Sequence, residues 1–599
     1  MTAEGDRHEW NLEDIYPDLE AWDAALTGIQ DGIESLRDLA GTLDSGPSAL
    51  LHCLDLHVTV LKAMYRASSY ASMKYHEDTR VGATAGMEQR VGLIATQLSE
   101  AASYIEPEIL SIGRETVNRY LEAEPELRSY AHQLDDILRR AEHTRSASEE
   151  EIIAAAGLVT EVPSTGYAML ANADAPWPRV TLSTGTEFLL NQAGYSRYRS
   201  TADRDDRELV FREFFSVWQQ FRRTLGTLLY AQVKRDVFYA RVRKYDSSLD
   251  ASLDADRIPP SVYRTLIEQA NEHLHVLHRY FGLRARMMGL DQMRYWDIYP
   301  PLVRGDDSYP IERGKQLVLD SLAPLGDEAR RPIERGFDSR WMDVYPRQGK
   351  KSGAYMNGHV YDVHPYVLMN YNDDYESVST LAHEWGHALH SYLTNETQHF
   401  VNADYSIFVA EVASTLNEAL LLHRMLDEAA DAAGRLFYLG HALEQLRGTF
   451  FRQSMFAEFE LSIHEKVEAG SALTADEFGK LYGNLLRRYH GHEEGVVHID
   501  DVFEVEWAYI PHFYYNFYVY QYATAVAASS FLAEQILDGR PGAAAAYLDL
   551  LRAGGAGYPY DLLVEAGVDL AGPEPYRALM RRMGHIMDEI ESLLEEGAA

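Results

Sequence analysis

The chain has 599 residues, 46% of them hydrophobic, a formal net charge of −37 and one cysteine. This length is sufficient for several compact parts and a large buried core. The strongly acidic balance disfavours nucleic acids and anionic membrane surfaces as partners. The single cysteine, Cys53, excludes an intramolecular disulfide and a cysteine-based metal site.

The first residues and the hydropathy of the chain indicate where in the cell the protein is located. The first ten residues contain no apolar signal-peptide core, and no apolar run approaches 18 residues. Together with the lone cysteine, these features favour a cytoplasmic protein that does not span a membrane. The acidic composition fits a salt-adapted protein, whereas a GC-rich genome explains the excess of arginine over lysine equally well, so the sequence leaves the source open.

Helical periodicity dominates the first part of the chain. It predicts four long amphipathic helices, over residues 20–45, 48–80, 84–105 and 113–142. From 159 to 200 prolines and glycines interrupt the pattern, and 179–183 is typical of a short strand. We therefore place a boundary near residue 200, which predicts an N-terminal helical lobe over 1–200 and a second domain over 201–599.

Helical periodicity resumes over 206–241 and 259–290. Residues 291–365 are the most irregular part because prolines interrupt them repeatedly, and only short strands are predicted there, at 302–303 and 342–345. After residue 405 the chain is again predicted to be helical almost to its end. The sequence thus predicts a mainly α-helical protein with little sheet.

Residues 367–371 are predicted to form a strand, and they lie directly before the motif on which the functional interpretation depends. If this strand lies at the edge of a sheet, it can pair with an extended peptide by β-augmentation. If it lies inside a sheet, it is only structural. The sequence allows both interpretations.

The motif itself is His-Glu-x-x-His, at His383, Glu384 and His387. Residues 376–394 contain no proline, and Asp373 with Glu376 resembles a capping box, so a helix is expected here. Positions i and i+4 lie on one face of a helix, and two imidazoles there can bind one metal ion. A carboxylate at Glu384 can accept a proton from a water molecule at the metal.

A catalytic zinc ion needs a third protein ligand and one open position. A third histidine six residues after His387 is ruled out because Leu393 occupies that position. The remaining candidates are the acidic residues that follow, namely Glu396, Asp404, Glu411 and Glu418. Glu411 is favoured because it lies in an apolar helical run that can pack antiparallel to the motif helix. Thr415 and Glu418 follow on roughly the same face and are expected to contact the ligand histidines.

A second histidine-rich cluster contains His490, His492, Glu493 and His498. Glycines surround these residues, so we expect a solvated loop without fixed ligand geometry. The glycine-rich run at 554–557 lacks the Lys-Ser/Thr pair of a phosphate-binding loop, and we expect a flexible turn there.

Five ordered motifs carry a resemblance to a known family. They are residues 349–355, residues 365–373, the His-Glu-x-x-His motif, residues 408–418, and the tyrosine-rich segment 510–524; residues 10–17 add to them. With them the chain resembles the oligoendopeptidase F group of the thimet-oligopeptidase-like zinc metallopeptidases, from about residue 8 to about residue 585.

This resemblance implies a two-lobed, mainly α-helical metallopeptidase with a deep substrate cleft and a small sheet beside the zinc-binding helix. It implies one Zn²⁺ per chain, held by His383, His387 and Glu411. It also implies that 201–599 is the catalytic domain and that the substrates are short peptides. A helix that began at His512 would place the tyrosines of the last motif on one stripe.

In the family, a histidine and tyrosines of this segment bind the substrate and the tetrahedral intermediate. His512 matches the histidine. Tyr515 and Tyr518 are the favoured donors to the oxyanion, with Tyr522 as the next candidate.

Two alternative functions stay open at this point. Helical zinc carboxypeptidases also use a His-Glu-x-x-His motif, so the chain could trim peptide C-termini instead of cleaving internal bonds. A catalytically inactive peptide-binding protein is a further alternative, and the intact Glu384 argues against it. The sequence leaves open whether the protein is a monomer or a homo-oligomer.

Overall fold

The computed structural model describes residues 8–303, 305 and 307–597. These residues form a mainly α-helical protein with three small sheets, which confirms the predicted fold class. The chain divides into two compact units. Unit 1 comprises Met1–Glu142, Asp307–Arg424 and Leu532–Val568, and unit 2 comprises His143–Asp306, Met425–Phe531 and Asp569–Ala599.

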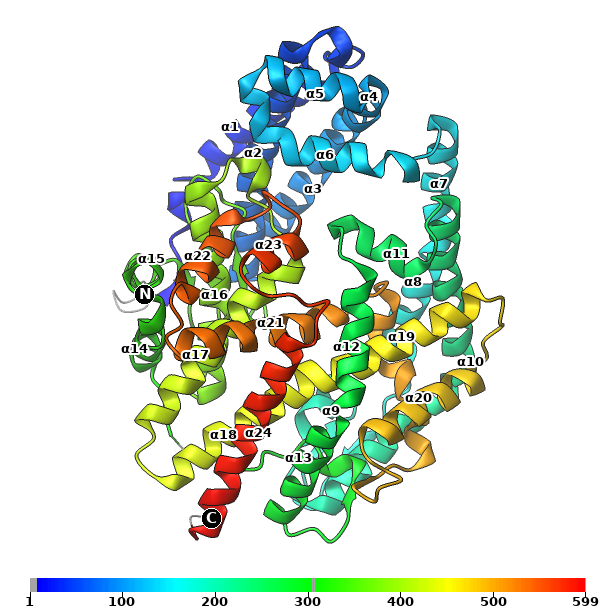
Figure 1. Ribbon diagram of the computed structural model, residues 1–599, viewed down its shortest axis with the longest axis vertical. Coiled ribbons are helices and arrows are strands. Elements are labelled where there is room, and N and C mark those ends of the chain that lie inside the picture. Colours follow the sequence, from blue (N-terminus) through cyan, green and yellow to red (C-terminus); the bar gives the residue numbers. More distant parts are fainter. Residues whose placement is uncertain (1–7, 304, 306, 598–599) are drawn as a thin grey trace. The chain divides into compact units, whose positions relative to one another are not determined.

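Unit 1 combines N-terminal helices with the segment that carries the His-Glu-x-x-His motif (Figure 1). Its helices are α1 (Leu19–Arg37), α2 (Pro47–Glu77), α3 (Gly82–Ala102), α4 (Ile105–Ile112), α5 (Arg114–Ala123), α6 (Ala131–Arg139), α14 (Ile311–Ser321), α15 (Asp327–Asp338), α16 (Tyr375–Thr397), α22 (Ala543–Ala553) and α23 (Pro559–Glu565). Helix α17 (Ile407–Glu428) begins in unit 1, and α21 (Tyr520–Leu537) ends in it. The core of α1–α6 continues to Val360, Tyr366 and Leu368, so it reaches the sheet beside α16.

The sheet of unit 1 has three short strands in the order β4 (Met342–Asp343), β6 (Tyr366–Leu368), β5 (Tyr355–Asn357). Strand β4 runs parallel to β6, and β5 runs antiparallel to it. The strand predicted near 367–371 is therefore the buried middle strand, and the interpretation of it as an edge strand is wrong. Strand order depends on tertiary pairing, which an apolar run does not encode. The two edge strands are β4 and β5.

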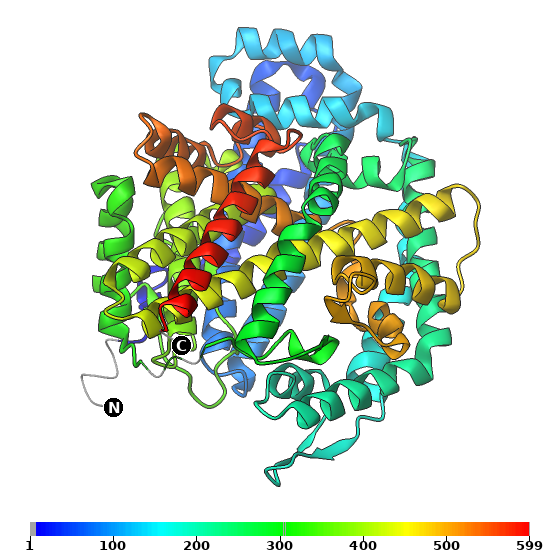
Figure 2. The same cartoon turned by 60° about the horizontal axis from the view of Figure 1, so that its bottom comes forward.

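Unit 2 is also built mainly from helices. They are α7 (Ala147–Thr160), α8 (Val162–Met169), α9 (Gln192–Tyr198), α10 (Arg204–Val242), α11 (Ser248–Leu253), α12 (Pro260–Glu272), α13 (Leu274–Met287), α18 (Ala432–Leu446), α19 (Arg452–Glu468), α20 (Ala475–Tyr489) and α24 (Glu574–Glu595). Helix α24, in red, packs on α13 and α18 (Figure 2). Strands β1 (Arg179–Thr181) and β2 (Glu187–Leu189) form a hairpin, and β3 (Met293–Arg294) pairs in parallel with β7 (Val497–His498).

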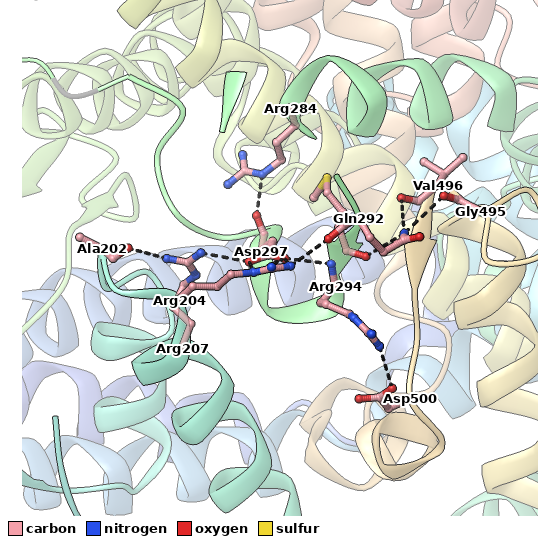
Figure 3. Close-up of polar contacts among 11 residues, drawn as sticks. Ala202, Arg204, Arg207, Arg284, Gln292, Arg294, Asp297, Gly495, Val496 and Asp500 are labelled. Carbon is pink, nitrogen blue, oxygen red and sulfur yellow. Dashed lines mark hydrogen bonds and ion pairs between the residues drawn. The ribbon is translucent and has the colours of Figure 1, made fainter. Parts of the chain in front are cut away.

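A buried carboxylate holds the turn that follows β3 in unit 2 (Figure 3). Asp297 is fully buried, and its carboxylate accepts hydrogen bonds from Arg204 and Arg207 at 2.6 and 3.0 Å. The backbone N–H of Arg294 donates to the same carboxylate, and Arg284 donates to the Asp297 carbonyl. Loss of one partner would leave a buried charge without compensation, so this cluster fixes the turn against α10 and α13.

Most predicted helices are present with shifted ends. The first three predicted helices correspond to α1, α2 and α3, and the strand predicted at 179–183 is β1. The fourth predicted helix, over 113–142, is divided into α5 and α6, because Pro125 begins a 3-10 turn between them. Helix α4 lies before it and ends just before Gly113, which adopts a left-handed backbone. Residues 302–303 form no strand.

The region that the prolines suggested to be irregular contains two helices, α14 and α15. Helix α15 includes Pro332, so this proline did not mark a helix end. Each unit takes segments from both sides of residue 200, and the division into 1–200 and 201–599 stays a prediction.

Candidate metal centre

Helix α16 presents the His-Glu-x-x-His motif. The Asp374 side chain caps its first turn by accepting a hydrogen bond from the Ser377 N–H at 2.8 Å. Asp373, one residue earlier, has a left-handed φ of 56° and lies outside the helix. The predicted capping box at Asp373 and Glu376 is therefore replaced by a cap one residue later. The helix is otherwise continuous through the motif.

Helices α16 and α17 approach closely at a glycine inside the motif. A Cβ atom on Gly386 would lie 2.7 Å from the carbonyl oxygen of Ala413, so a larger residue would push the two backbones apart. The side chain of Asn417 donates to the Ala382 carbonyl at 3.2 Å and ties the helices together. This packing delivers Glu411, in the first turns of α17, to the histidine face of α16.

The three predicted metal ligands lie together. Nε2 of His383 and Nε2 of His387 are 3.7 and 3.9 Å from Oε2 of Glu411. One donor atom from each residue lies within 4.8 Å of the others, and all three side chains are half-buried. Tetrahedral zinc with ligands at about 2.0–2.1 Å separates its donors by about 3.3 Å. The donor set and its spacing therefore fit a zinc ion after a small inward movement of the side chains.

Further polar contacts orient these ligands. Nδ1 of His383 lies 2.6 Å from Oε1 of Glu418, and the His387 imidazole hydrogen bonds to the Ala410 carbonyl. Ser414 donates to Oε2 of Glu411 at 3.2 Å. The Glu418 contact agrees with the sequence-based expectation.

The contacts of Thr415 and Ser414 differ from what the sequence suggested. Thr415 donates to the backbone carbonyl of Glu411 within its own helix and contacts neither histidine. The contribution of Ser414 was missed, because serine on a helix gives no distinct sequence signal.

Glu384 is buried, with 7% of its surface exposed, and points toward the β5 edge of the sheet. Burial and the charges of Glu411 and Glu418 raise its pKa to about 7, although the charge of His383 and a hydrogen bond from the Met356 N–H act in the opposite direction. A carboxyl group with a pKa near neutrality can both accept and release a proton. The contact to Met356, in β5, was not foreseen from the sequence.

The two histidines differ in electrostatic environment. Burial lowers the pKa of His383, but the hydrogen bond and the charge of Glu418, together with Glu384 and Glu411, outweigh it and raise the pKa to about 9. Burial and the neighbouring His383 lower the pKa of His387 to about 3. The carboxyl groups of Glu384, Glu411 and Glu418 surround His383, and their negative charge favours a divalent cation.

His512 lies in unit 2, in a 3-10 turn over Pro511–Tyr514. The predicted helix that begins at His512 is wrong, because α21 begins only at Tyr520. Asn516 and Phe517 between them have left-handed φ values of 48° and 58°. Residues with side chains rarely adopt this conformation, and two in succession make a sharp turn.

Despite this turn, the predicted tyrosines gather around His512. The ring centroids of Tyr515, Tyr518 and Tyr522 lie 5.7, 6.3 and 6.4 Å from that of His512. The Tyr522 hydroxyl donates to the Tyr518 hydroxyl at 3.4 Å. Tyr515 is 56% exposed, so at least one side chain of the group is open to solvent.

The other candidates do not form a metal site in the part of the chain that the structure describes. His490 is buried and its Nδ1 contacts the Leu486 carbonyl, whereas Nδ1 of His492 accepts the Ile499 N–H. Within the described residues, the one group of three or more possible ligands is His383, His387 and Glu411. Glu396 and Asp404 are not part of it.

Comparisons with known proteins show that the chain is similar to peptidases. The sequence profile of Peptidase family M3 matches residues 197–582, and that of Oligopeptidase F matches residues 108–175. The chain is 39% identical to the oligopeptidase PepF of Bacillus subtilis, over 98% of this chain and 87% of the relative. It is 35% identical to the group B oligopeptidase PepB of Streptococcus agalactiae, over 99% and 98% of the two chains.

Solved structures of peptidases also resemble this chain. The crystal structure of oligoendopeptidase-F from Enterococcus faecium matches with a TM-score of 0.74 at 32% identity, covering 96% of this chain and 99% of the other. A candidate peptidase from Chlamydophila abortus matches with a TM-score of 0.91 at 32% identity, covering 98% of both chains. No helix among residues 8–303, 305 and 307–597 has the length and apolar character needed to cross a membrane. The chain belongs to peptidase family M3, as a metallopeptidase of the oligoendopeptidase F group.

Proposed function

We propose that the protein is a zinc-dependent endopeptidase that hydrolyses internal bonds of short peptides. The observation that carries this proposal is the convergence of His383, His387 and Glu411 beside the buried carboxyl group of Glu384. The three residues would hold one zinc ion. When bound, zinc would act as a Lewis acid, which polarises the peptide carbonyl and lowers the pKa of a water molecule at the metal.

Glu384 acts as the proton carrier. Its carboxylate accepts a proton from the attacking water, and the resulting carboxylic acid gives that proton to the nitrogen of the leaving amine. A pKa of about 7 suits both steps at neutral pH. Its burial keeps bulk water from competing for the proton, and the Met356 N–H holds the carboxyl group in place.

Residues around this centre have positioning roles. Glu418 accepts a hydrogen bond from Nδ1 of His383 and so directs Nε2 toward the metal position. Ser414 fixes the Glu411 carboxylate. We assign His512 and the hydroxyls of Tyr515 and Tyr518 as donors that stabilise negative charge on the carbonyl oxygen, by resemblance to the family. The clustering of these rings in unit 2 supports that assignment.

The substrates are short peptides, as the names of the curated relatives say of those proteins. The family membership favours an endopeptidase over a carboxypeptidase. Cytoplasmic location is part of this proposal, and the lone cysteine, which fits a reducing compartment, supports it.

One experiment tests the metal, the proton carrier and the type of cleavage together. Internally quenched peptides with both ends blocked are digested by the wild type and by Glu384→Gln, and zinc content is measured in both. We expect one zinc per chain in each protein, internal cleavage by the wild type, and a loss of about 10²–10⁴-fold in kcat for the variant. If blocked peptides are not cut while free C-termini are trimmed, the carboxypeptidase alternative replaces the proposal.

A further inference from the structure

Unit 1 contains a cavity of about 180 Å³ that is separate from the metal ligands. Its walls include aromatic side chains from α2 and from the loops around α16, namely Tyr65, His359, Tyr361 and Phe400. The Tyr65 ring centroid lies 5.3 Å from that of His359 and 6.0 Å from that of Phe400, and Tyr361 lies 5.5 Å from Phe400. The rings therefore form one continuous aromatic surface.

Polar groups in the same cavity lack partners within the described protein. The carboxylate of Asp404 is exposed and makes no hydrogen bond or ion pair with any described residue. The buried side-chain oxygen of Gln133 has no hydrogen-bond partner either. Lys62 is paired with Asp362 at 3.1 Å, and its ammonium lies 5.5 Å from the centroid of the Tyr361 ring, so this ring already has a cation over it. The Gln133 oxygen is thus a buried acceptor left for a ligand to satisfy, and the solvated Asp404 carboxylate is a negative charge that a ligand can reach.

The loop that carries Asp404 is held in place by the glycine-rich run at 554–557. The Gly555 N–H donates to the Asn402 carbonyl at 2.8 Å. A Cβ on Gly555 would lie 2.1 Å from the Asp404 carbonyl oxygen, so only glycine permits this approach. The run predicted to be a flexible turn therefore supports the cavity, and the carboxylate is carried by an anchored loop.

The cavity lies along the motif helix. Its lining residue Asn395 donates to the Gly358 carbonyl at 3.3 Å and joins α16 to the loop that follows β5. Asn395 is eight residues beyond His387, which corresponds to about 12 Å along a helix. An extended peptide advances about 3.3 Å per residue. A peptide that lay along the outer edge of β5, past Glu384, would reach the cavity three to four residues from the cleaved bond.

We propose that this cavity is a subsite for a positively charged group of the peptide substrate, either a lysine or arginine side chain or the N-terminal amine. The carboxylate of Asp404 pairs with the charge, and the aromatic surface of Tyr65 and Phe400 contacts the cation and the alkyl chain that carries it. An anion is disfavoured because the unpaired charge here is negative. The inference rests on the proposed endopeptidase function and adds a preference for one substrate position.

The test uses neutral peptides with blocked ends, in which one lysine replaces norleucine at successive positions on both sides of the cleaved bond. We expect lysine to raise kcat/KM about fivefold at a position three or four residues from that bond. A peptide that begins at this position with a free amine, compared with its acetylated form, separates the N-terminal amine from the side chain as the source of the charge.

Asp404→Asn removes the charge and keeps the shape. It is expected to reduce the preference to less than about twofold while kcat/KM for the norleucine peptide stays unchanged. Asp38→Asn is the matched control, because Asp38 is an exposed aspartate that does not line the cavity. The proposal is overturned if no position shows a preference, if Asp404→Asn retains it, or if Asp38→Asn lowers it equally, since the last result would reflect the general negative charge. Failure of the proposed function is distinct, because the norleucine peptide would then not be cleaved at all.

Discussion

The Nδ1 atom of His383 lies 2.6 Å from the Oε1 atom of Glu418. The contact joins the motif helix to α17 one residue from Glu384. It fixes the imidazole so that Nε2 faces Glu411, and it adds negative charge to the site without occupying a ligand position. Glu411 and Glu418 therefore have different roles, although both are half-buried carboxylates on one helix.

Substitution of these two carboxylates is expected to give graded losses of metal. Glu411→Ala leaves two histidines, which cannot hold zinc tightly, so zinc should be lost on dialysis against a weak chelator. Glu418→Gln keeps a hydrogen-bond acceptor but removes the charge, and the zinc affinity should fall about 10–100-fold. Metal content and competition with a chromophoric chelator measure both. Full zinc occupancy in Glu411→Ala would exclude Glu411 as a ligand.

The local part of the metal site could be predicted from the sequence. The spacing of His383 and His387 follows from helical periodicity, and the apolar run around Glu411 indicates a buried helix. The closeness of the two helices could not be predicted. The close approach of the helices depends on the contact between Gly386 and the Ala413 carbonyl. These two residues lie in different helices, and the sequence does not state how those helices pack.

Two other expectations failed for tertiary reasons. The strand near 367–371 has the apolar composition of any buried strand, and only its pairing with both β4 and β5 makes it central. The tyrosine segment was expected to be helical from His512, but Asn516 and Phe517 adopt a left-handed backbone that intrinsic propensity disfavours. Such a conformation persists only where surrounding contacts impose it.

The tyrosine cluster gives a prediction about turnover. Tyr518 accepts a hydrogen bond from Tyr522, so its own hydroxyl proton is available for the substrate oxygen. We expect Tyr518→Phe and Tyr515→Phe each to lower kcat by about 10²–10³-fold with little change in KM, because the donors act mainly on the transition state. Zinc content should stay at one per chain.

Tyr514→Phe is the matched control for the tyrosine cluster. Tyr514 is buried and stacks on Tyr167 at 4.6 Å, so its loss should affect Tm rather than kcat. If Tyr518→Phe lowers only Tm and turns over normally, Tyr518 is a packing residue and Tyr522 becomes the candidate donor.

The left-handed turn gives a prediction about Glu460. Its carboxylate is fully buried and accepts the backbone N–H of Phe517 at 2.7 Å. Ser252 donates to the neighbouring Asn516 carbonyl at 2.9 Å. These contacts oppose the strain of the turn, which costs about 1–3 kcal/mol for each residue with a side chain.

Glu460→Leu would leave the Phe517 N–H buried without an acceptor, at a cost of about 1–3 kcal/mol. We expect this variant to lower both Tm and kcat, because Phe517 lies between Tyr515 and Tyr518 in the chain. Glu460→Gln keeps the acceptor and should restore both. Thermal unfolding and peptide kinetics measure the two effects. Equal kcat in Glu460→Leu and the wild type would show that the turn does not depend on this contact.

The last prediction concerns the pH dependence of stability. His490 in unit 2 is buried, with 6% of its surface exposed, and its Nδ1 hydrogen bonds to the Leu486 carbonyl. Burial, together with the positive charges of Arg447 and Arg452, lowers its pKa to about 3, although the hydrogen bond acts in the opposite direction. The folded protein therefore holds His490 neutral well below the usual histidine pKa of about 6.5.

Because the folded pKa lies below the unfolded pKa, the unfolded chain binds the proton first as the pH falls. The contribution of His490 to stability is fully present above about pH 6.5 and is lost progressively toward pH 3. Between pH 8 and pH 5 this loss amounts to about 2 kcal/mol. His490→Asn keeps a donor for the Leu486 carbonyl but cannot titrate. Urea unfolding should thus show that the wild type loses about 2 kcal/mol more than the variant over this range. Parallel pH profiles for the two proteins would mean that His490 is protonated in the folded state or is accessible to water.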